Sequence, residues 1–392
     1  MATAAGLQRE SSEAPGQVAA AQSRARLMPW QSLDTPEARL SWDALAQWAS
    51  EPNPFHESWY LLPALRALDP HGSVAILRFD HDGELAGLLP LRRENRYYRW
   101  PLPQWCNWAH GNCFLGAPLV AAGLERPFWR ALLAWLDGNP GAGLFLHLVQ
   151  MPLDGPLHAA LQAVLAEQGR AAALVLGEER AMLASPLSAA EYFEASLSGK
   201  KRKELRRQHN RLGELGELTF ERSEDDHRLA RWIDDFLALE HSGWKGAAGS
   251  ALASHQATAR MFREALSGAS ARGRLERLTL SLDGEPIAML ANFVTPPGAF
   301  SFKTAFDERY ARYSPGVLLQ RENLALLDRA GIEWCDSCAS ADHPMIDHIW
   351  RERRQIGRLS IAIGGALRRA LFGQLVRAEL GRNPAGIARQ TG

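Results

Sequence analysis

Two parts of this chain repeat the same order of secondary-structure signals, and this repeat constrains the fold more than any other sequence feature. Val74–Leu91 reads as a β-hairpin around an Asp-Gly turn, and Leu275–Val294 reads as a second hairpin around the same turn. In each part a helical pattern and then a short apolar strand pattern follow the hairpin. These segments are Pro127–Asp137 with Leu144–Val149 and Pro315–Ala330 with Ile332–Cys335. The order predicts a tandem duplication of an α/β unit, with at least one parallel crossover in each half.

The length of the chain supports a division into domains. Its 392 residues exceed the size at which one hydrophobic core usually stops growing, so we expect two domains. Ser185-Pro186 interrupts the chain between the repeated parts, and Ala366–Leu380 reads as a last helix. The fold class is α/β, with a mixed twisted sheet flanked by helices in each domain. The predicted divisions are a disordered leader (1–28), an N-terminal domain (29–185), a C-terminal domain (186–370) and a helix end with tail (371–392).

Composition narrows the classes of partner and compartment. Lys+Arg and Asp+Glu are 44 each, so no global charge attracts nucleic acid or an anionic membrane. Four cysteines do not make a disulfide framework, which indicates a reducing compartment and predicts a cytoplasmic protein. No stretch approaches the roughly 20 apolar residues of a membrane span. Cys335 and Cys338 have metal-ligand spacing, and His343, Asp347 and His348 are nearby donors. A structural zinc site needs four ligands and Cys106 and Cys113 lie in the other half, so we expect no metal.

A local basic run interrupts this neutral background. Seven basic residues crowd twelve positions and read as one helix, opposed only by Glu204. They are Lys200, Lys201, Arg202, Lys203, Arg206, Arg207 and Arg211. Such a helix suits the phosphates of a donor, an acidic carrier protein or RNA, and it also suits a plain solvated face. The neutral net charge makes nucleic acid the weakest of these partners.

Four segments carry a resemblance to a known family. They are KKRKELRRQ (200–208), LEHSGWKG (239–246), FKTAFDERYARYSPGVLL (302–319) and WCDSCASADHPMIDHIW (334–350). The C-terminal half resembles the GNAT-like acyltransferase domain of proteins linked to cellulose and exopolysaccharide biosynthesis. That group is related in fold to the Fem peptidyltransferases, which are tandem GNAT proteins. The resemblance implies an acyl thioester donor, usually coenzyme A (acetyl-CoA) or a carrier-protein thioester, and an amine acceptor.

The predicted donor site is a strand, a loop and a helix start. Ser314 suits an N-cap, and Gly316 allows a ligand to approach the backbone at a helix end that favours anions. The expected phosphate contacts are Arg309, Arg312, Tyr313, Ser314, Gly316 and Val317. A plain helix start behind a solvated loop explains the same residues, and Gly316 is the one glycine present where GNAT domains typically carry two. Glu125 at the equivalent place in the first half would repel phosphate, which puts the active site in the second half.

Three residues are candidates for proton transfer. Glu240 ends a helical pattern, Asp336 lies on a strand beside the expected acyl chain, and His343 precedes a proline in a loop. Each also has a structural interpretation, as a helix-end carboxylate, a helix cap and a loop histidine respectively. The candidate substrate contacts are Trp244, Lys245, Lys303 and Asp307, the last two of which share a strand face and could pair with each other.

The expected activity is therefore N-acyl transfer, with the acceptor near Trp244-Lys245 and the end of the Asp336 strand. No tyrosine follows Tyr313 to protonate the leaving thiolate, so Ser337, Cys338 or water would do so. Two alternatives stay open. One is an aminoacyl-tRNA-dependent peptidyltransferase like the Fem enzymes, and the other is a non-catalytic accessory protein of polysaccharide assembly.

Overall fold

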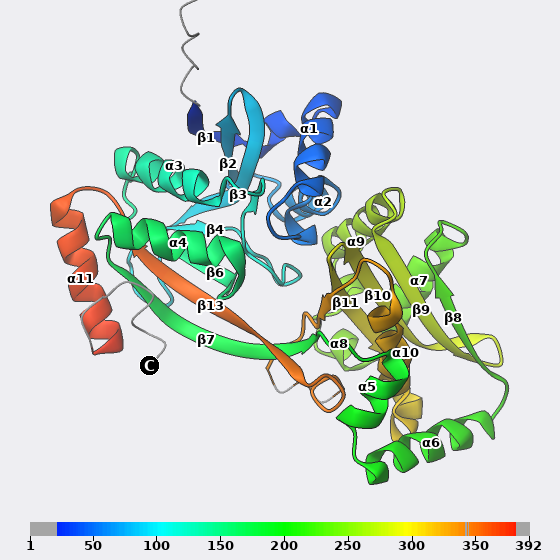
Figure 1. Ribbon diagram of the computed structural model, residues 1–392. Helices are drawn as coiled ribbons and strands as arrows, with labels where there is room; N and C mark the ends of the chain where they lie inside the picture. The colour runs from blue at the N-terminus through cyan, green and yellow to red at the C-terminus, as the bar shows by residue number, and fades with distance from the viewer. Residues whose placement is uncertain (1–21, 342, 344, 382–392) are drawn as a thin grey trace, which may run out of the picture.

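The structure, a computed structural model, describes residues 22–341, 343 and 345–381. Two α/β halves share one mixed sheet, with helices packed along it (Figure 1). The first half contains β1 (Ser23–Pro29), η1 (Trp30–Leu33), α1 (Pro36–Gln47), η2 (Pro54–His56), α2 (Ser58–Leu68), β2 (Ala75–His81), β3 (Glu84–Glu94), β4 (Gln104–Asn107), β5 (Leu119–Val120), α3 (Glu125–Gly138), β6 (Phe145–Pro152), α4 (Gly155–Glu167) and β7 (Ala172–Leu183).

Two helices, α5 (Ala189–Ser196) and α6 (Gly199–Gly213), lead into the second half. The second half contains β8 (Leu218–Ser223), α7 (Leu229–Ser242), α8 (Trp244–Ala247), η3 (Leu252–Ser254), α9 (Gln256–Ser270), β9 (Leu275–Leu282), β10 (Glu285–Thr295), β11 (Gly298–Phe306), η4 (Glu308–Tyr313), α10 (Pro315–Asn323), η5 (Leu324–Asp328), β12 (Trp334–Asp336), β13 (Glu352–Ala362) and α11 (Ala366–Leu380).

The predicted repeat is present in both halves. The β2–β3 and β9–β10 hairpins turn on Asp82-Gly83 and Asp283-Gly284, and all four residues have positive φ angles between 50° and 87°. These angles are those of a type I′ turn, which Asp-Gly favours. After each hairpin a third strand pairs in parallel with a fourth across a helix: β4 with β6, and β11 with β12. The predicted parallel crossover in each half is therefore confirmed.

The two halves exchange their last strands. The order of the sheet is β1-β2-β3-β4-β6-β13-β7-β12-β11-β10-β9-β8, with β5 paired to β3. β13 comes from the end of the chain yet pairs with β6 of the first half, and β7 of the first half pairs with β12 of the second. β7 and β13 also pair with each other along most of their length and cross between the halves in Figure 1. Backbone hydrogen bonds therefore join the halves into one sheet.

This exchange corrects the predicted domain limits. The predicted division at residue 185 falls just after β7 ends at Leu183. Residues 352–381, however, pair with strands of the first half and pack against it, although the second half precedes them in the chain. β13 lies between β6 and β7, and α11 packs its Phe372 and Val376 against Tyr97 and Phe145 of the first half. The C-terminal helix itself, Ala366–Leu380, has the bounds that its sequence pattern predicts.

The predicted disordered leader is too long. Ser23–Pro29 forms β1 and pairs with His81–Ala75 of β2 in antiparallel register. Residues 1–21 of the leader and residues 382–392 of the predicted tail lie outside the described residues.

An aromatic core fills the junction of the halves. Phe55 and Tyr60 of the first half contact Phe293 and Phe302 of the second, with ring centroids between 5.7 and 6.2 Å apart. Helices α2 and α9, one from each half, pack against each other beside this core. The four cysteines are buried and form no disulfide. Within residues 22–341, 343 and 345–381, none of the helices has the length and apolar character needed to cross a bilayer.

Three histidines with strongly lowered pKa values predict acid sensitivity. Burial lowers the pKa of His56 and His147 to about 4 and, with the charge of Lys303, the pKa of His110 to about 3. An unfolded chain takes up these protons near pH 6.5, so stability should fall as the pH drops from about 6.5 towards 4. Glu51 acts in the opposite direction, because burial raises its pKa to about 7 and protonation at lower pH then favours the folded chain.

We expect the free energy of unfolding to fall by about 2 kcal/mol for each of these histidines between pH 7 and pH 5. The opposite effect of Glu51 cancels the contribution of about one histidine. Urea denaturation at the two pH values measures the net change. His56→Gln should remove its own share of the dependence, and substitution of the exposed His71 serves as the control. Stability that rises on acidification would contradict the assignment.

Candidate functional site

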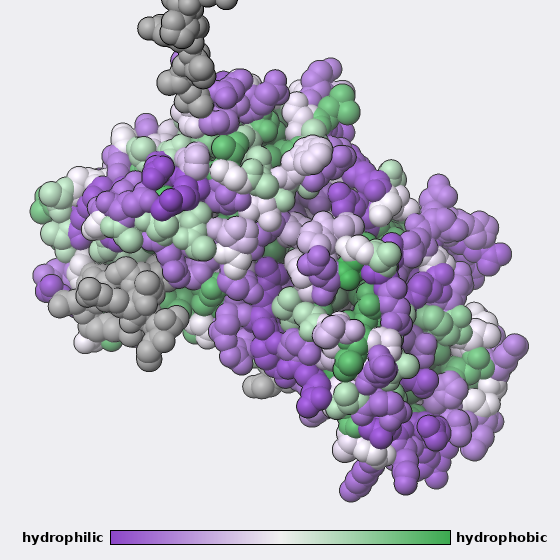
Figure 2. Space-filling view, viewed as in Figure 1, coloured by the Kyte–Doolittle hydropathy of each residue, from purple (hydrophilic) through white to green (hydrophobic). Residues whose placement is uncertain are grey.

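A pocket opens where β11 and β12 separate. β12 pairs with β11 only over Gly298–Phe300, while β11 continues to Phe306. Beyond Phe300 the other edge of β11 stays paired with β10, and the edge toward β12 meets no strand within the described parts of the chain. A pocket of about 570 Å³ runs along this edge and includes Ser301–Phe306 in its wall. Figure 2 shows apolar surface gathered on this half among hydrophilic residues.

The corresponding gap in the first half is bridged. β4 and β6 also pair in parallel over two residues, Trp105 and Cys106. Beyond them Asn107 spans the gap: its Nδ2 donates to the carbonyls of Val149 and Gly116, both at 2.9 Å, and its Oδ1 accepts the Val149 N–H at 2.7 Å. A Cβ added to Gly116 would lie 2.1 Å from the Val149 oxygen, so the two segments touch. The duplicated units therefore differ at this gap.

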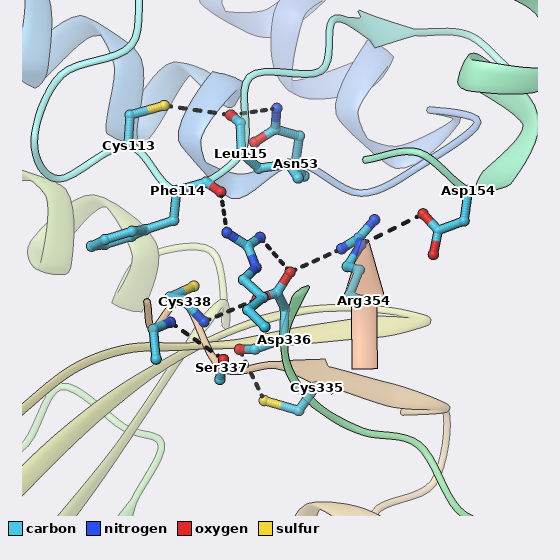
Figure 3. A network of polar contacts seen from close by, with 12 residues as sticks. Asn53, Cys113, Phe114, Leu115, Asp154, Cys335, Asp336, Ser337, Cys338 and Arg354 are labelled. Atoms are coloured by element: carbon cyan, nitrogen blue, oxygen red, sulfur yellow. Dashed lines mark hydrogen bonds and ion pairs between the residues drawn. The ribbon is translucent and has the colours of Figure 1, made fainter. Parts of the chain in front are cut away.

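Asp336, a predicted proton-transfer residue, is bound by two arginines. Its Oδ2 accepts from Arg180 of β7 at 2.5 Å and from Arg354 of β13 at 3.1 Å, and Figure 3 shows Asp336 and Arg354 joined in this network. All three side chains are buried. Burial alone would raise the pKa of Asp336, but the two guanidinium charges outweigh it and hold the pKa below its usual value. A carboxylate so bound cannot accept a substrate proton near neutral pH. The structure therefore corrects this role to a structural one.

The same carboxylate shapes the pocket wall. Asp336 Oδ1 accepts the N–H of Cys338 at 2.9 Å, and Cys338 adopts a φ of 53°. The turn that follows, Ser337–Ser340, lines the pocket. Because Arg180 and Arg354 lie on the two exchanged strands, the strand exchange fixes the wall of the pocket.

Glu240 has both oxygens occupied. Its Oε1 accepts from Lys245 Nζ at 2.9 Å and its Oε2 accepts the N–H of Leu252 at 2.8 Å. The side chain is buried at the end of α7 and lines the pocket. These bonds hold the segment that contains α8 in place, and they leave neither carboxylate oxygen free to act as a base. The side chain of Trp244 beside Glu240 is exposed, and the backbone N–H of Trp244 donates to Glu308 Oε1 at 2.7 Å.

His343 lies in the wall of the pocket. The side chain is half-buried, and its buried Nδ1 has no hydrogen-bond partner among the residues that the structure describes. Burial lowers the pKa of His343, and the charge of Lys245 adds to this against the opposing effect of Asp347. The imidazole is therefore neutral near pH 7 and able to accept a proton.

Lys303 also lines the pocket, on β11. Its Nζ lies 5.5 Å from the ring centroid of Phe114 and 5.9 Å from that of Phe302. Asp307 does not pair with it. Asp307 caps η4 by accepting the N–H of Arg309 at 2.9 Å and binds the Arg309 side chain. Of its two predicted roles, pairing with Lys303 is therefore wrong, and Asp307 does not line the pocket that the described residues form.

The predicted phosphate site is closed in the structure. Gly316 is buried, and a Cβ there would lie 2.7 Å from Met345 Sδ and 3.4 Å from a Phe306 ring atom. Ser314 has a φ of 54° and its side chain makes no capping bond. The other predicted phosphate contacts do not line the pocket that the described residues form; they are Arg309, Arg312, Tyr313 and Val317. Arg309 is bound to Asp307, Arg312 lies over the Tyr313 ring at 4.7 Å, and Val317 follows within α10.

The basic helix α6 lies on the surface next to η4. Leu205 and Leu212 are its buried residues, and Gln208 Nε2 donates to the Arg312 carbonyl at 3.5 Å. Arg202 pairs with Glu194 and Arg207 with Glu204. The other basic side chains of the run are exposed: Lys200, Lys201, Lys203, Arg206 and Arg211.

Sequence reasoning missed several residues of the site. Phe114 comes from a loop of the first half, and Arg180 and Arg354 come from the exchanged strands. None of them belongs to a local motif, so only the tertiary structure places them. Across residues 22–341, 343 and 345–381, no group of three or more His, Cys, Asp or Glu side chains could hold a metal ion.

Comparison with known proteins defines the class of this domain. Residues 199–343 match the sequence model of the family described as "Acetyltransferase (GNAT) domain". This match covers most of the pocket lining, the splayed β11–β12 pair and α6, so the second half contains a GNAT-type acetyltransferase domain. No curated protein matches the chain.

Solved structures agree with this fold over most of the chain. The crystal structure of FemX is 11% identical, with a TM-score of 0.53, over 86% of this chain and 98% of that chain. A conserved protein of unknown function from Bacteroides thetaiotaomicron is 12% identical, with a TM-score of 0.51, over 84% of this chain and 97% of that chain. At these identities the similarity concerns the fold alone.

Proposed function

We propose that this protein is an N-acyltransferase that moves an acyl group from a thioester, with acetyl-CoA as the simplest donor, to an amine. The observation that carries this proposal is the free edge of β11 along the pocket in the GNAT-type domain. An extended thioester arm that contains amides can pair with such an edge as an added strand would. The bridged gap in the first half limits the proposed reaction to one site per chain.

The proposed chemistry uses the side chains that line the pocket. The amine attacks the thioester carbon and loses a proton to His343, and collapse of the tetrahedral adduct breaks the carbon–sulfur bond. The thiolate then takes a proton from water or from the hydroxyl of Ser337. The acceptor is proposed to approach past Trp244 and Lys245, at the exposed side of the pocket.

The distal end of the donor is proposed to extend toward α6. The exposed basic side chains at Lys200–Arg211 suit the phosphates of coenzyme A or the surface of an acidic carrier protein. η4 connects the two places, because Glu308 lines the pocket and Arg312 contacts α6. The cytoplasmic location and the link to polysaccharide or cell-envelope biosynthesis remain part of the proposal and rest on the composition and on the family resemblance.

A thiol-release assay tests the transfer. Acetyl-CoA is offered with amino sugars, amino acids and polyamines, and free thiol is measured for the natural protein and for Ala339→Trp, which places a large side chain at the half-buried pocket wall. We expect acceptor-dependent release and a loss of about 100-fold or more in the variant. Ala271→Trp on the exposed end of α9 is the matched control. Absence of release with every acceptor, or equal release by both tryptophan variants, would contradict the proposal.

The exposed basic face of α6 also favours a second donor, an aminoacyl-tRNA. Binding of tRNA through this helix would weaken steeply with salt and would be lost on charge reversal of Lys200, Lys201 and Lys203. If tRNA binds in this way and acetyl-CoA gives no thiol release, we would assign aminoacyl-tRNA and not coenzyme A as the donor.

A further inference from the structure

Lys303 is a cation in an apolar setting. Its ammonium lies 5.5 Å from the ring centroid of Phe114 and 5.9 Å from that of Phe302, and the residue belongs to the strand that forms the pocket wall. Among the described residues no hydrogen bond or ion pair reaches its Nζ. The aromatic rings offer only a weak attraction, of about 0.5–1 kcal/mol at an exposed site and more when desolvated. Within the described part of the pocket wall, this positive charge therefore has no anionic partner.

The titratable groups around Lys303 do not supply that partner. Glu240 of α7 is bound to Lys245 of α8. His110, from the first half, is neutral because burial and Lys303 lower its pKa to about 3, and the Cys338 thiol is neutral because burial raises its pKa. Burial and the charge of Lys245 lower the pKa of Lys303 to about 8, against the weaker effects of Glu240 and Cys338. The ammonium form still dominates at neutral pH.

We propose that Lys303 binds a carboxylate of the substrate, so that the protein acts on an amino acid or a related carboxylate-bearing molecule. This inference rests on the proposed acyl transfer and names its substrate class. A single ammonium in the pocket wall suits a group of one negative charge. The carboxylates of Glu240 and Glu308 in the same wall oppose a dianion such as phosphate.

The carboxylate could belong to the acceptor or to the acyl group, and two arms of the experiment separate these sources. The first arm compares amino acids with their carboxamides as acceptors of the acetyl group of acetyl-CoA. The second compares succinyl-CoA with butyryl-CoA as donors. Each arm uses the natural protein, Lys303→Met and Lys303→Arg, and circular dichroism confirms that each variant is folded.

In one of the two arms we expect the natural protein to prefer the carboxylate-bearing substrate over its uncharged counterpart by about 10- to 100-fold in kcat/KM. This is the range for a hydrogen bond to a charged group. Lys303→Met should abolish the preference and Lys303→Arg should retain most of it. No preference in either arm, or a preference that survives in Lys303→Met, would overturn the proposal. An equal loss on the carboxamide would also overturn it, because Lys303 would then act in the chemistry and not on the carboxylate.

Calorimetric binding without turnover separates this inference from the reaction itself. If the natural protein binds amino acids more tightly than their amides and Lys303→Met does not, the carboxylate site stands even where no thiol is released. If thiol is released but neither binding nor rate distinguishes carboxylate from amide, the acyl transfer stands and the carboxylate site fails.

Discussion

Replacing Asp336 with asparagine should lower the free energy of unfolding by about 3–5 kcal/mol, as expected when one partner is removed from a buried ion network. The substitution leaves Arg180 and Arg354 buried without their shared counter-charge. Those arginines lie on the two exchanged strands, so the loss also loosens the junction between the halves. Urea denaturation of the natural and variant proteins measures the change.

Asp154→Asn is the matched control. Asp154 is more than half exposed and lies 3.7 Å from Arg354, so its loss should cost no more than about 1 kcal/mol. Replacing all three members of the buried network with apolar residues should recover stability, since no charge is then left unpaired. An Asp336→Asn protein as stable as the Asp154→Asn protein would show that the network does not hold the exchanged strands.

Replacing His343 with glutamine should lower kcat for acyl transfer by about 100-fold, the lower end of what a general base contributes. The natural protein should lose activity as the pH falls below about 6.5, because protonation of the imidazole removes the base. Since burial lowers the pKa of His343, the midpoint of that loss lies below the ordinary histidine value. The measurement is the pH profile of kcat/KM with a saturating donor.

The glutamine variant should lack this acidic limb while binding the donor with unchanged affinity. His348→Gln provides the control, because His348 is exposed and lies outside the pocket lining that the described residues form. If His343→Gln retains both the rate and the acidic limb, another group accepts the proton.

The topology of each half could be predicted because its signals are local. An Asp-Gly pair between apolar runs specifies a tight hairpin by its own backbone preferences, and both such pairs form one. The helix and strand that follow also show themselves by periodicity, and each pair produces the predicted parallel crossover. The location of the active site in the second half stays a prediction.

The exchange of β7 and β13 could not be predicted, because pairing between distant strands leaves no signal in either strand alone. The role expected of Asp336 changed for the same reason, since Arg180 lies 156 residues away in the chain. Local reasoning made Gly316 an open approach to a helix start, but Met345 packs over it from a different loop. Ser314 has the residue type of a cap yet adopts a left-handed conformation without a capping bond.

Because only one of the two duplicated gaps is open among the described residues, each chain should bind one donor, and the stoichiometry of donor binding tests this directly. Titration calorimetry with acetyl-CoA should show one site per chain, with a dissociation constant of about 1 μM to 1 mM, the usual range for enzyme substrates. Ala339→Trp should abolish the binding and Ala271→Trp should leave it unchanged. Two sites per chain, no binding, or binding that persists in Ala339→Trp would contradict the assignment of the open β11 edge as the donor site.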